Sequence, residues 1–270
     1  MSTFTIPVVL PGAKAHGLSR RARLTISRAL VFVALAGIWQ SLYLTGALPE
    51  AAPDVAGIFI ALVTVLTTSA FWVAVGQTLF GAFSGLGIAA VVGIVLGVAI
   101  GTNGFLSRSV EVFVEFGRAF PMLALMPVVV LVIGVNARME ILMVFLSCLW
   151  PILIQSIAGS RRQDQSVADT VSVFRITPLR RFWRVTLPSA MPLISTGLRI
   201  SASISILVSV GVGVLSQTPG LGRQITLAQE ASRWDVAFAY IIFAGLVGWA
   251  LNSAIAAVEA KALKWNRQEI

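Results

Sequence analysis

The chain has 270 residues, of which 57% are hydrophobic and only 11% are charged, and its mean hydropathy is +0.90. A composition this apolar excludes an ordinary soluble domain and indicates an integral membrane protein. The net charge of +9 does not indicate nucleic-acid binding, because the basic residues are scattered between apolar segments and form no aromatic-basic binding surface. A single cysteine, Cys148, excludes a disulfide framework within the chain and is interpreted as a small packing residue.

The first 49 residues divide into a tail and one membrane span. Residues 1–28 are polar and basic, and the one histidine, His16, is expected to be solvated there. The uncharged stretch from Ala29 to Pro49 has the length of one span. Since the apolar core of a signal peptide has only about 7–15 residues, we expect a retained helix.

The next apolar segment, from Val55 to Ser107, contains no charged residue and is far too long for one span of roughly 20 residues. We expect an interfacial or re-entrant helix up to about Phe71 and a second span from Val73 to Ile100. Glycines recur in this span in steps of four, at Gly81 and Gly85 and again at Gly93, Gly97 and Gly101. This spacing predicts close packing on a neighbouring helix, although glycine is also simply common in membrane helices.

Four more spans are predicted beyond this point, at residues 119–137, 141–160, 192–216 and 236–258. An amphipathic cytoplasmic helix is predicted before them, from the charges of Arg108, Glu111, Glu115 and Arg118. Pro121 and Pro127 lie inside or at the mouth of the third span and are expected to bend it.

The positive-inside rule predicts the orientation of these six spans. An even number of spans places both termini on the same side of the membrane. If that side is the cytoplasm, only three basic residues are left outside, Arg138, Arg223 and Arg233. We therefore expect a multi-pass protein of the cell (inner) membrane with both termini in the cytoplasm.

One long charged segment, from Arg161 to Pro192, interrupts the apolar second half of the chain. Its apolar residues recur at roughly helical intervals, which predicts short amphipathic helices in water. Thr177-Pro178 divides the segment, because threonine is a good N-cap and proline is suited to the first helical position. The pattern therefore predicts a helix, a turn and a second helix, with Pro188 and Pro192 marking the return to the membrane.

Part of this segment, DTVSVFRITPLRRFWRVTLP at residues 169–188, resembles the cytoplasmic EAA loop of binding-protein-dependent ABC importer permeases. Leu187-Pro188 match the end of that motif and Asp169 stands for its glutamate, whereas Arg175 replaces its glycine. Three further stretches are similar to the nitrate/sulfonate/taurine branch of the family: residues 121–127, 188–200 and 220–222. The chain departs from this branch where Asn136-Ala137 replaces Gly-Glu and Gly213 replaces a glutamate.

The resemblance implies an all-α integral membrane fold of the type I ABC importer permease kind, with about six transmembrane helices. It implies a basic tail at 1–28, a single permease domain at 29–270 and a coupling loop at 161–190. The ATPase-coupling residues would be Asp169, Val171, Phe174, Arg175, Thr177, Pro178, Arg180 and Arg181.

The function implied by the resemblance is import by alternating access. A small polar or anionic solute, of the sulfonate, taurine or nitrate kind, would pass from an extracytoplasmic solute-binding protein to the cytoplasm. The other partners would be two ABC ATPase subunits and a second permease copy or relative. ATP and Mg would be bound by the ATPases, and no cofactor by this chain.

The absence of catalytic motifs from the sequence agrees with that division of labour. It contains no G-x-x-x-x-G-K-[ST] pattern, no cluster with metal-ligand spacing and no visible nucleophile-base pair. We therefore expect that the chain is not an enzyme. We expect no acid or base near the middle of the spans, which argues against coupling to protons or sodium. A membrane scaffold or assembly subunit is the alternative, and an ABC exporter fits less well.

A stripe of small residues in the predicted fifth span is the candidate solute pathway. Ser201, Ser205, Ser209 and Gly213 are spaced by four residues and therefore share one face of a helix. Hydroxyl groups along one face can hydrogen bond to water or an anion. Small residues also allow helices to pack closely, and a serine can bond to its own helix. The sequence leaves both interpretations open.

Overall fold

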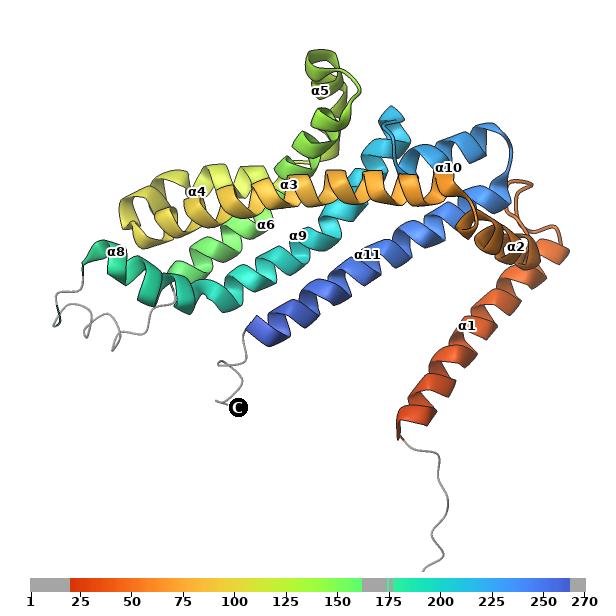
Figure 1. The fold of residues 1–270 in the computed structure, drawn as a ribbon, viewed down its shortest axis with the longest axis horizontal. Helices are drawn as coiled ribbons and strands as arrows, with labels where there is room; N and C mark the ends of the chain where they lie inside the picture. The colour runs from red at the N-terminus through yellow and green to blue at the C-terminus, as the bar shows by residue number, and fades with distance from the viewer. Residues whose placement is uncertain (1–19, 162–173, 175–176, 263–270) are drawn as a thin grey trace, which may run out of the picture. The chain divides into compact units, whose positions relative to one another are not determined.

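The computed structural model describes residues 20–161, 174 and 177–262, and the regular structure within them is helical (Figure 1). Five helices are long and apolar enough to cross a membrane, or six if one bent pair is counted as a single span. The predicted all-α fold with about six spans is confirmed.

The chain forms two compact units, Met1–Val55 and Ala56–Ile270. In the first unit, α1 (Arg20–Leu44) begins nine residues before the predicted span. The loop after α1 is bonded to the helix. The indole Nε1 of Trp39 donates to the Pro53 carbonyl at 2.9 Å, and the backbone N–H of Val55 donates to Gln40 Oε1 at 2.9 Å.

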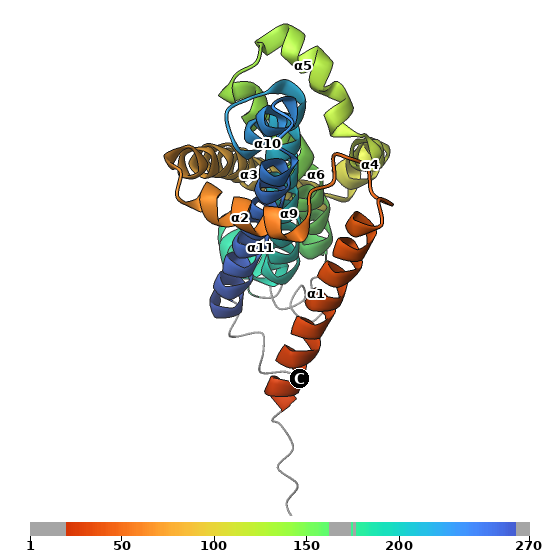
Figure 2. The same cartoon turned by 90° about the vertical axis from the view of Figure 1, so that its right-hand side faces the viewer.

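The second unit is built on four long helices, which run side by side in Figures 1 and 2. They are α3 (Ser69–Thr102), α6 (Ala137–Arg161), α9 (Leu187–Ser216) and α11 (Trp234–Ala262). Helices α3, α6 and α9 pack against one another, and α11 packs against α9. The shorter helices are α2 (Val55–Leu66), α4 (Gly104–Ala119), η1 (Met122–Leu125), α5 (Met126–Ile133), α8 (Pro178–Arg181), η2 (Phe182–Thr186) and α10 (Leu221–Glu230).

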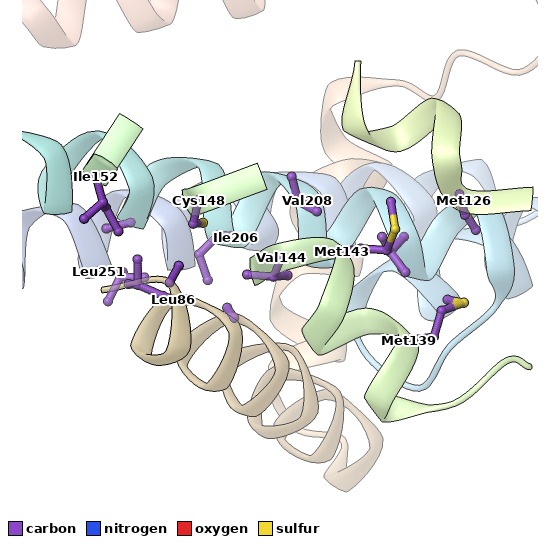
Figure 3. Packing of buried hydrophobic residues seen from close by; sticks show 14 residues of the cluster. Leu86, Met126, Met139, Met143, Val144, Cys148, Ile152, Ile206, Val208 and Leu251 are labelled. Atoms are coloured by element: carbon purple, nitrogen blue, oxygen red, sulfur yellow. The ribbon is translucent and has the colours of Figure 1, made fainter. Parts of the chain in front are cut away.

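The main core lies where the long helices meet. Its buried side chains include Leu86 of α3, Val144 and Ile152 of α6, Ile206 of α9 and Leu251 of α11 (Figure 3). Cys148 belongs to this core, so its interpretation as a packing residue is confirmed.

The glycines of α3 form a close contact with α6. A methyl group on Gly85 would lie 2.6 Å from Val144 Cβ, and one on Gly97 would lie 2.4 Å from Ser156 Cβ. Gly81, Gly93 and Gly101 face Glu140, Ile152 and Ser160 in the same way. The predicted close packing is confirmed, because a larger side chain at these positions would push the two helices apart.

The predicted third span, residues 119–137, begins at a sharp bend and contains only the short helices η1 and α5. Helix α4 and the segment Met122–Ile133 are bent by 81° relative to each other. Helix α5 has only eight residues, or about 12 Å, whereas the hydrocarbon layer is about 30 Å thick. The break lies at Phe120-Pro121, both extended, because a proline disfavours the helical conformation of the preceding residue. Pro127 lies in the first turn of α5, where a proline does not bend the helix.

The second predicted helix of the charged segment continues directly into the membrane helix. Helix α8, the π-turn η2 and α9 follow one another without interruption from Pro178 to Ser216. Pro188 lies in the first turn of α9, and Pro192 lies inside the helix. The π-turn immediately precedes these prolines, and such turns accommodate locally irregular hydrogen bonding in a helix.

The spans also contain ionisable side chains that the sequence analysis did not place there. Glu140 is buried in α6, which begins four residues before the predicted span. Arg199 of α9 forms an ion pair with Glu259 of α11, and Ser195 Oγ donates to that carboxylate at 2.9 Å. The expectation concerned only the middle of the spans. Glu140 and Glu259 lie near the ends of α6 and α11 and do not contradict it. It was wrong for Arg199, which lies well inside the predicted fifth span, residues 192–216.

Candidate functional site

Five of the eight predicted ATPase-coupling residues lie within the described part of the chain. They are Phe174, Thr177, Pro178, Arg180 and Arg181, whereas Asp169, Val171 and Arg175 lie outside the described residues. Phe174 is 73% exposed, and both arginines are exposed in α8. A large apolar side chain and two cations are thus accessible at the start of this helix.

The local structure at Thr177 follows from the sequence. The Arg181 N–H donates to the Thr177 carbonyl at 2.8 Å, and α8 begins at Pro178. A proline at the first helical position loses no hydrogen bond, because that N–H has no partner within the helix. The start predicted from Thr177-Pro178 is therefore where the helix begins.

The junction between α8 and α9 is anchored on α3. Phe182 and Leu187 are partly buried against Val98 of α3 and against Ala190 and Ile194 of α9. Since the interior of a protein is close-packed, a displacement of α8 is transmitted to these helices and not absorbed locally. The arrangement can therefore carry a push on the exposed segment into α9 and α3.

The small-residue stripe of α9 faces the interior of the chain. Ser201 Oγ donates to the Cys148 carbonyl at 2.9 Å, and Cys148 Sγ donates to the Ser201 carbonyl at 3.3 Å, which joins α9 to α6. Ser205 Oγ donates to Ala202 of its own helix at 2.8 Å. A methyl group on Gly213 would lie 3.1 Å from the Cα atom of Gly222 in α10. These contacts support the helix-packing interpretation of the stripe.

Two apolar cavities lie on another side of α9, beside the break between α4 and α5. One, of about 570 Å³, is lined by Phe120, Pro121, Trp150 and Val208, among others. The second, of about 620 Å³, is lined by residues that include Met126, Pro127, Val130 and Leu215. Leu123 lines both cavities, so the two are neighbours. Sequence reasoning missed these cavities. Their walls come from the segment around the break at Pro121 and from α9, and the sequence does not show that these segments are neighbours.

A buried polar cluster at the start of α6 was also missed. Ser209 Oγ donates to Glu140 Oε1 at 2.5 Å and lies 3.2 Å from the Thr78 carbonyl oxygen. The N–H of Leu221 donates to Thr78 Oγ1 at 2.9 Å. The cluster therefore joins α3, α6, α9 and α10. The sequence did contain one signal for this cluster, since Glu140 is a single acidic residue directly before the predicted span at 141–160.

Helix α10 packs against α9 through backbone contacts. A methyl group on Gly222 would lie 2.2 Å from the Val210 carbonyl oxygen and 2.6 Å from the Val214 nitrogen. Gly220, with φ of 151°, adopts a conformation that favours glycine at the turn before α10. Small residues are thus needed on both sides of this contact.

We expect Gly222→Ala to destabilise the protein by about 1–3 kcal/mol, because the backbone atoms that it meets cannot move aside as a side chain can. The measurement is the thermal unfolding midpoint of the purified protein in detergent. Gly87→Ala is the matched control, since a methyl group on Gly87 of α3 meets nothing within 4 Å. Equal midpoints for the two variants would contradict the close contact.

A family model described as "Binding-protein-dependent transport system inner membrane component" matches residues 89–262 of the chain. The match covers α6, the described part of the coupling segment, α9, α10 and α11. It therefore includes the described coupling residues and the small-residue stripe of α9, whereas Thr78 of the polar cluster precedes it.

Curated relatives match over the same part of the chain. The bicarbonate transport system permease protein of Synechocystis is 30% identical over 173 residues, or 64% of this chain and 62% of the relative. The nitrate import permease protein of the same organism is 30% identical over 176 residues, or 65% and 64%. The taurine transport system permease protein of Escherichia coli is 26% identical over 174 residues, or 64% and 63%. The chain thus matches less than two thirds of the length of these relatives.

Two solved structures show the same fold at lower identity. A bacterial ABC transporter involved in the import of the acidic polysaccharide alginate matches with a TM-score of 0.61 and 16% identity, over 90% of this chain and 96% of the other. The MetNI methionine ABC transporter in an inward-facing conformation matches with a TM-score of 0.56 and 19% identity, over 68% and 94%.

Proposed function

Since the chain belongs to the family of binding-protein-dependent transport system inner membrane components, we propose that it is the permease subunit of an ATP-driven importer. The observation that carries this proposal is the continuous helix from Pro178 to Ser216, which joins an exposed basic segment to the core of the membrane helices. In such a system this chain provides the membrane passage, and ATP is hydrolysed by partner subunits.

The proposed complex contains two ABC ATPase subunits, an extracytoplasmic solute-binding protein and a second permease, which is a copy of this chain or a relative. The ATPases bind ATP and Mg, and this chain binds no cofactor. The multi-pass chain lies in the inner membrane with both termini in the cytoplasm, on the side of the coupling segment. The distribution of basic residues supports this orientation.

The proposed solute is a small anion. Relatives of the chain are named for the transport of bicarbonate, nitrate, taurine and aliphatic sulfonates. These solutes share a compact, negatively charged oxygen group, which hydrogen-bond donors can recognise. Gly213, which replaces the glutamate of the branch, lies at the α9–α10 contact.

Transport is proposed to proceed by alternating access. ATP-driven closure of the two ATPases moves the coupling residues, and α6 and α9, which flank the segment on either side, carry the movement into the membrane. The turn at Thr177-Pro178 is the proposed hinge, because α8 begins there and continues directly into α9.

The test is uptake into proteoliposomes that contain the chain, its ATPase and internal ATP, with the binding protein outside. We expect ATP-dependent uptake of one of three labelled anions: nitrate, bicarbonate or taurine. An ATPase that lacks its phosphate-binding lysine is the control and should abolish uptake. A chain that binds no ATPase and supports no uptake would instead favour the scaffold alternative.

The same assay tests the hinge. Thr177→Ala together with Pro178→Ala should leave ATP hydrolysis near normal but lower the number of solutes moved per ATP several-fold. Removing the cap and the fixed proline angle loosens the start of α8 without touching the core. Wild-type transport per ATP in this variant would contradict the hinge.

A further inference from the structure

One buried carboxyl group in the membrane helices, that of Glu140, has no role in the proposed function as described above. Glu140 of α6 is only 4% exposed, and neither ion pair in the described part of the chain involves it. A carboxyl group is costly to bury in a membrane helix, and such groups commonly mark functional positions. Its surroundings therefore need an explanation.

Glu140 is held by hydrogen bonds that connect four helices. Ser209 of α9 bonds to it and approaches the carbonyl of Thr78 in α3, whose hydroxyl group accepts the N–H of Leu221 at the start of α10. Gly81 leaves the space that the carboxyl group occupies, since a methyl group there would overlap it. The side chains of this cluster are at least nine-tenths buried.

The cluster lies at the far end of the two helices that flank the coupling segment. Helix α6 ends at Arg161, immediately before that segment, and α9 follows η2, immediately after it. About 21 residues separate Glu140 from Arg161 and about 22 separate Leu187 from Ser209, or roughly 30 Å along each helix. This is the thickness of the hydrocarbon layer. Accordingly, α8 and α10 lie at opposite ends of the long helices in Figure 1.

Helix α10 follows α9 after a four-residue turn and packs against α9 and α11, and the hydrogen-bonded cluster joins its start to α3 and α6. Its first N–H is bonded to Thr78, and Gly222 packs on the backbone of α9. Its outer face is exposed at Arg223 and Glu230. A shift of α6 relative to α9 therefore either carries the start of α10 with it or breaks the hydrogen bonds around Glu140.

We propose that the hydrogen-bonded cluster of Glu140, Ser209 and Thr78 is a positioning element that transmits the ATP-driven movement of α6 and α9 to α10. The inference rests on the proposed function, because the movement begins at the ATPases. A broken cluster leaves a buried carboxyl group without a partner, so the bonded arrangement is strongly preferred over intermediate ones. Because of the cluster, the four helices move together at the end of the span that is remote from the ATPases.

The experiment follows α10 directly and needs no solute. A cysteine replaces Arg223 in a chain that carries Cys148→Ala, and its rate of reaction with a water-soluble maleimide is measured in the complete complex. We expect ATP with vanadate to change this rate by about fivefold or more, the lower range of allosteric couplings. Ser209→Ala and Glu140→Leu should each abolish the change, because each removes the hydrogen bond between Ser209 and Glu140.

Two variants separate positioning from general packing. Glu140→Gln keeps the side-chain length and an acceptor oxygen, and should retain the nucleotide-dependent change. Ser205→Ala removes an equally buried hydroxyl group that bonds only to its own helix, and should also retain it.

The outcomes distinguish the inference from the proposed function. Failure of the unmodified chain to bind its ATPase would overturn the proposed function and the inference with it. Normal ATPase binding with a full nucleotide effect in Ser209→Ala would overturn the inference alone. The inference alone would also be overturned if Glu140→Gln lost the nucleotide-dependent change in labelling rate as completely as Glu140→Leu. If Glu140→Leu does not accumulate, the smaller change Ser209→Ala decides.

Discussion

Replacing Asp169 by arginine and Phe174 by aspartate in one chain should abolish co-purification of the partner ATPase while the chain stays in the membrane. Phe174 is 73% exposed, although a phenyl group gains from burial, and aromatic side chains commonly anchor interfaces. Loss of such an anchor costs about 2 kcal/mol or more, roughly 30-fold in affinity. An aspartate in an apolar groove of the partner adds the cost of burying a charge, and Asp169→Arg reverses the charge of a second predicted coupling residue.

The measurement is the amount of ATPase that is retained when the tagged chain is purified. Phe105→Asp is the matched control, because Phe105 of α4 is 79% exposed and lies outside the coupling segment. Normal retention in the double variant would indicate that the segment contacts the lipid surface and not the ATPase.

Ser209→Trp should prevent stable accumulation of the protein. Ser209 is 3% exposed and lies between α3, α6 and α9, where its hydroxyl group reaches Glu140 and Thr78. Overpacking a core by a few methylene groups already costs about 1–3 kcal/mol, and an indole is much larger. The measurement is the yield of monodisperse protein after extraction from the membrane.

Leu207→Trp is the control for this change. Leu207 lies two residues away on α9 and is 70% exposed, so a tryptophan there meets no packed neighbour. An intact Ser209→Trp complex that retains ATPase activity but loses uptake would favour the pathway interpretation of the stripe. Reaction of cysteines at positions 205, 209 and 213 with thiol reagents, in a chain without Cys148, would support the same conclusion.

The long membrane helices could be predicted from the sequence because each is a long apolar stretch bounded by charged or turn-forming residues. The start of α8 was predictable for a similar reason, since Thr177-Pro178 is a local signal. The glycine spacing of α3 correctly predicted a close contact. It could not identify α6 as the partner, because spacing describes one helix only.

Three features of the structure could not be predicted from local sequence patterns. The short length of α5 is one of them, because the apolar residues 119–137 are long enough for one span, whereas the helix ends at Ile133 after only eight residues. Helix α10 is too short and too polar to resemble a membrane helix. Periodicity placed Ser201, Ser205 and Ser209 on one face of α9, but the neighbour of that face depends on the packing of the whole bundle.

The glycine face of α3 also has a consequence for biosynthesis. Helix α3 is synthesised before α6, and residues 103–136 separate the two in the chain. Its glycines then accept only the residues that face them, from Gly81 opposite Glu140 to Gly101 opposite Ser160. A slip of α6 along α3 by one residue would bring side chains onto positions without room for them. The contact with α3 thus fixes the position of α6 along the membrane normal. It thereby also fixes the level at which Arg161, the last residue of α6, leaves the bilayer.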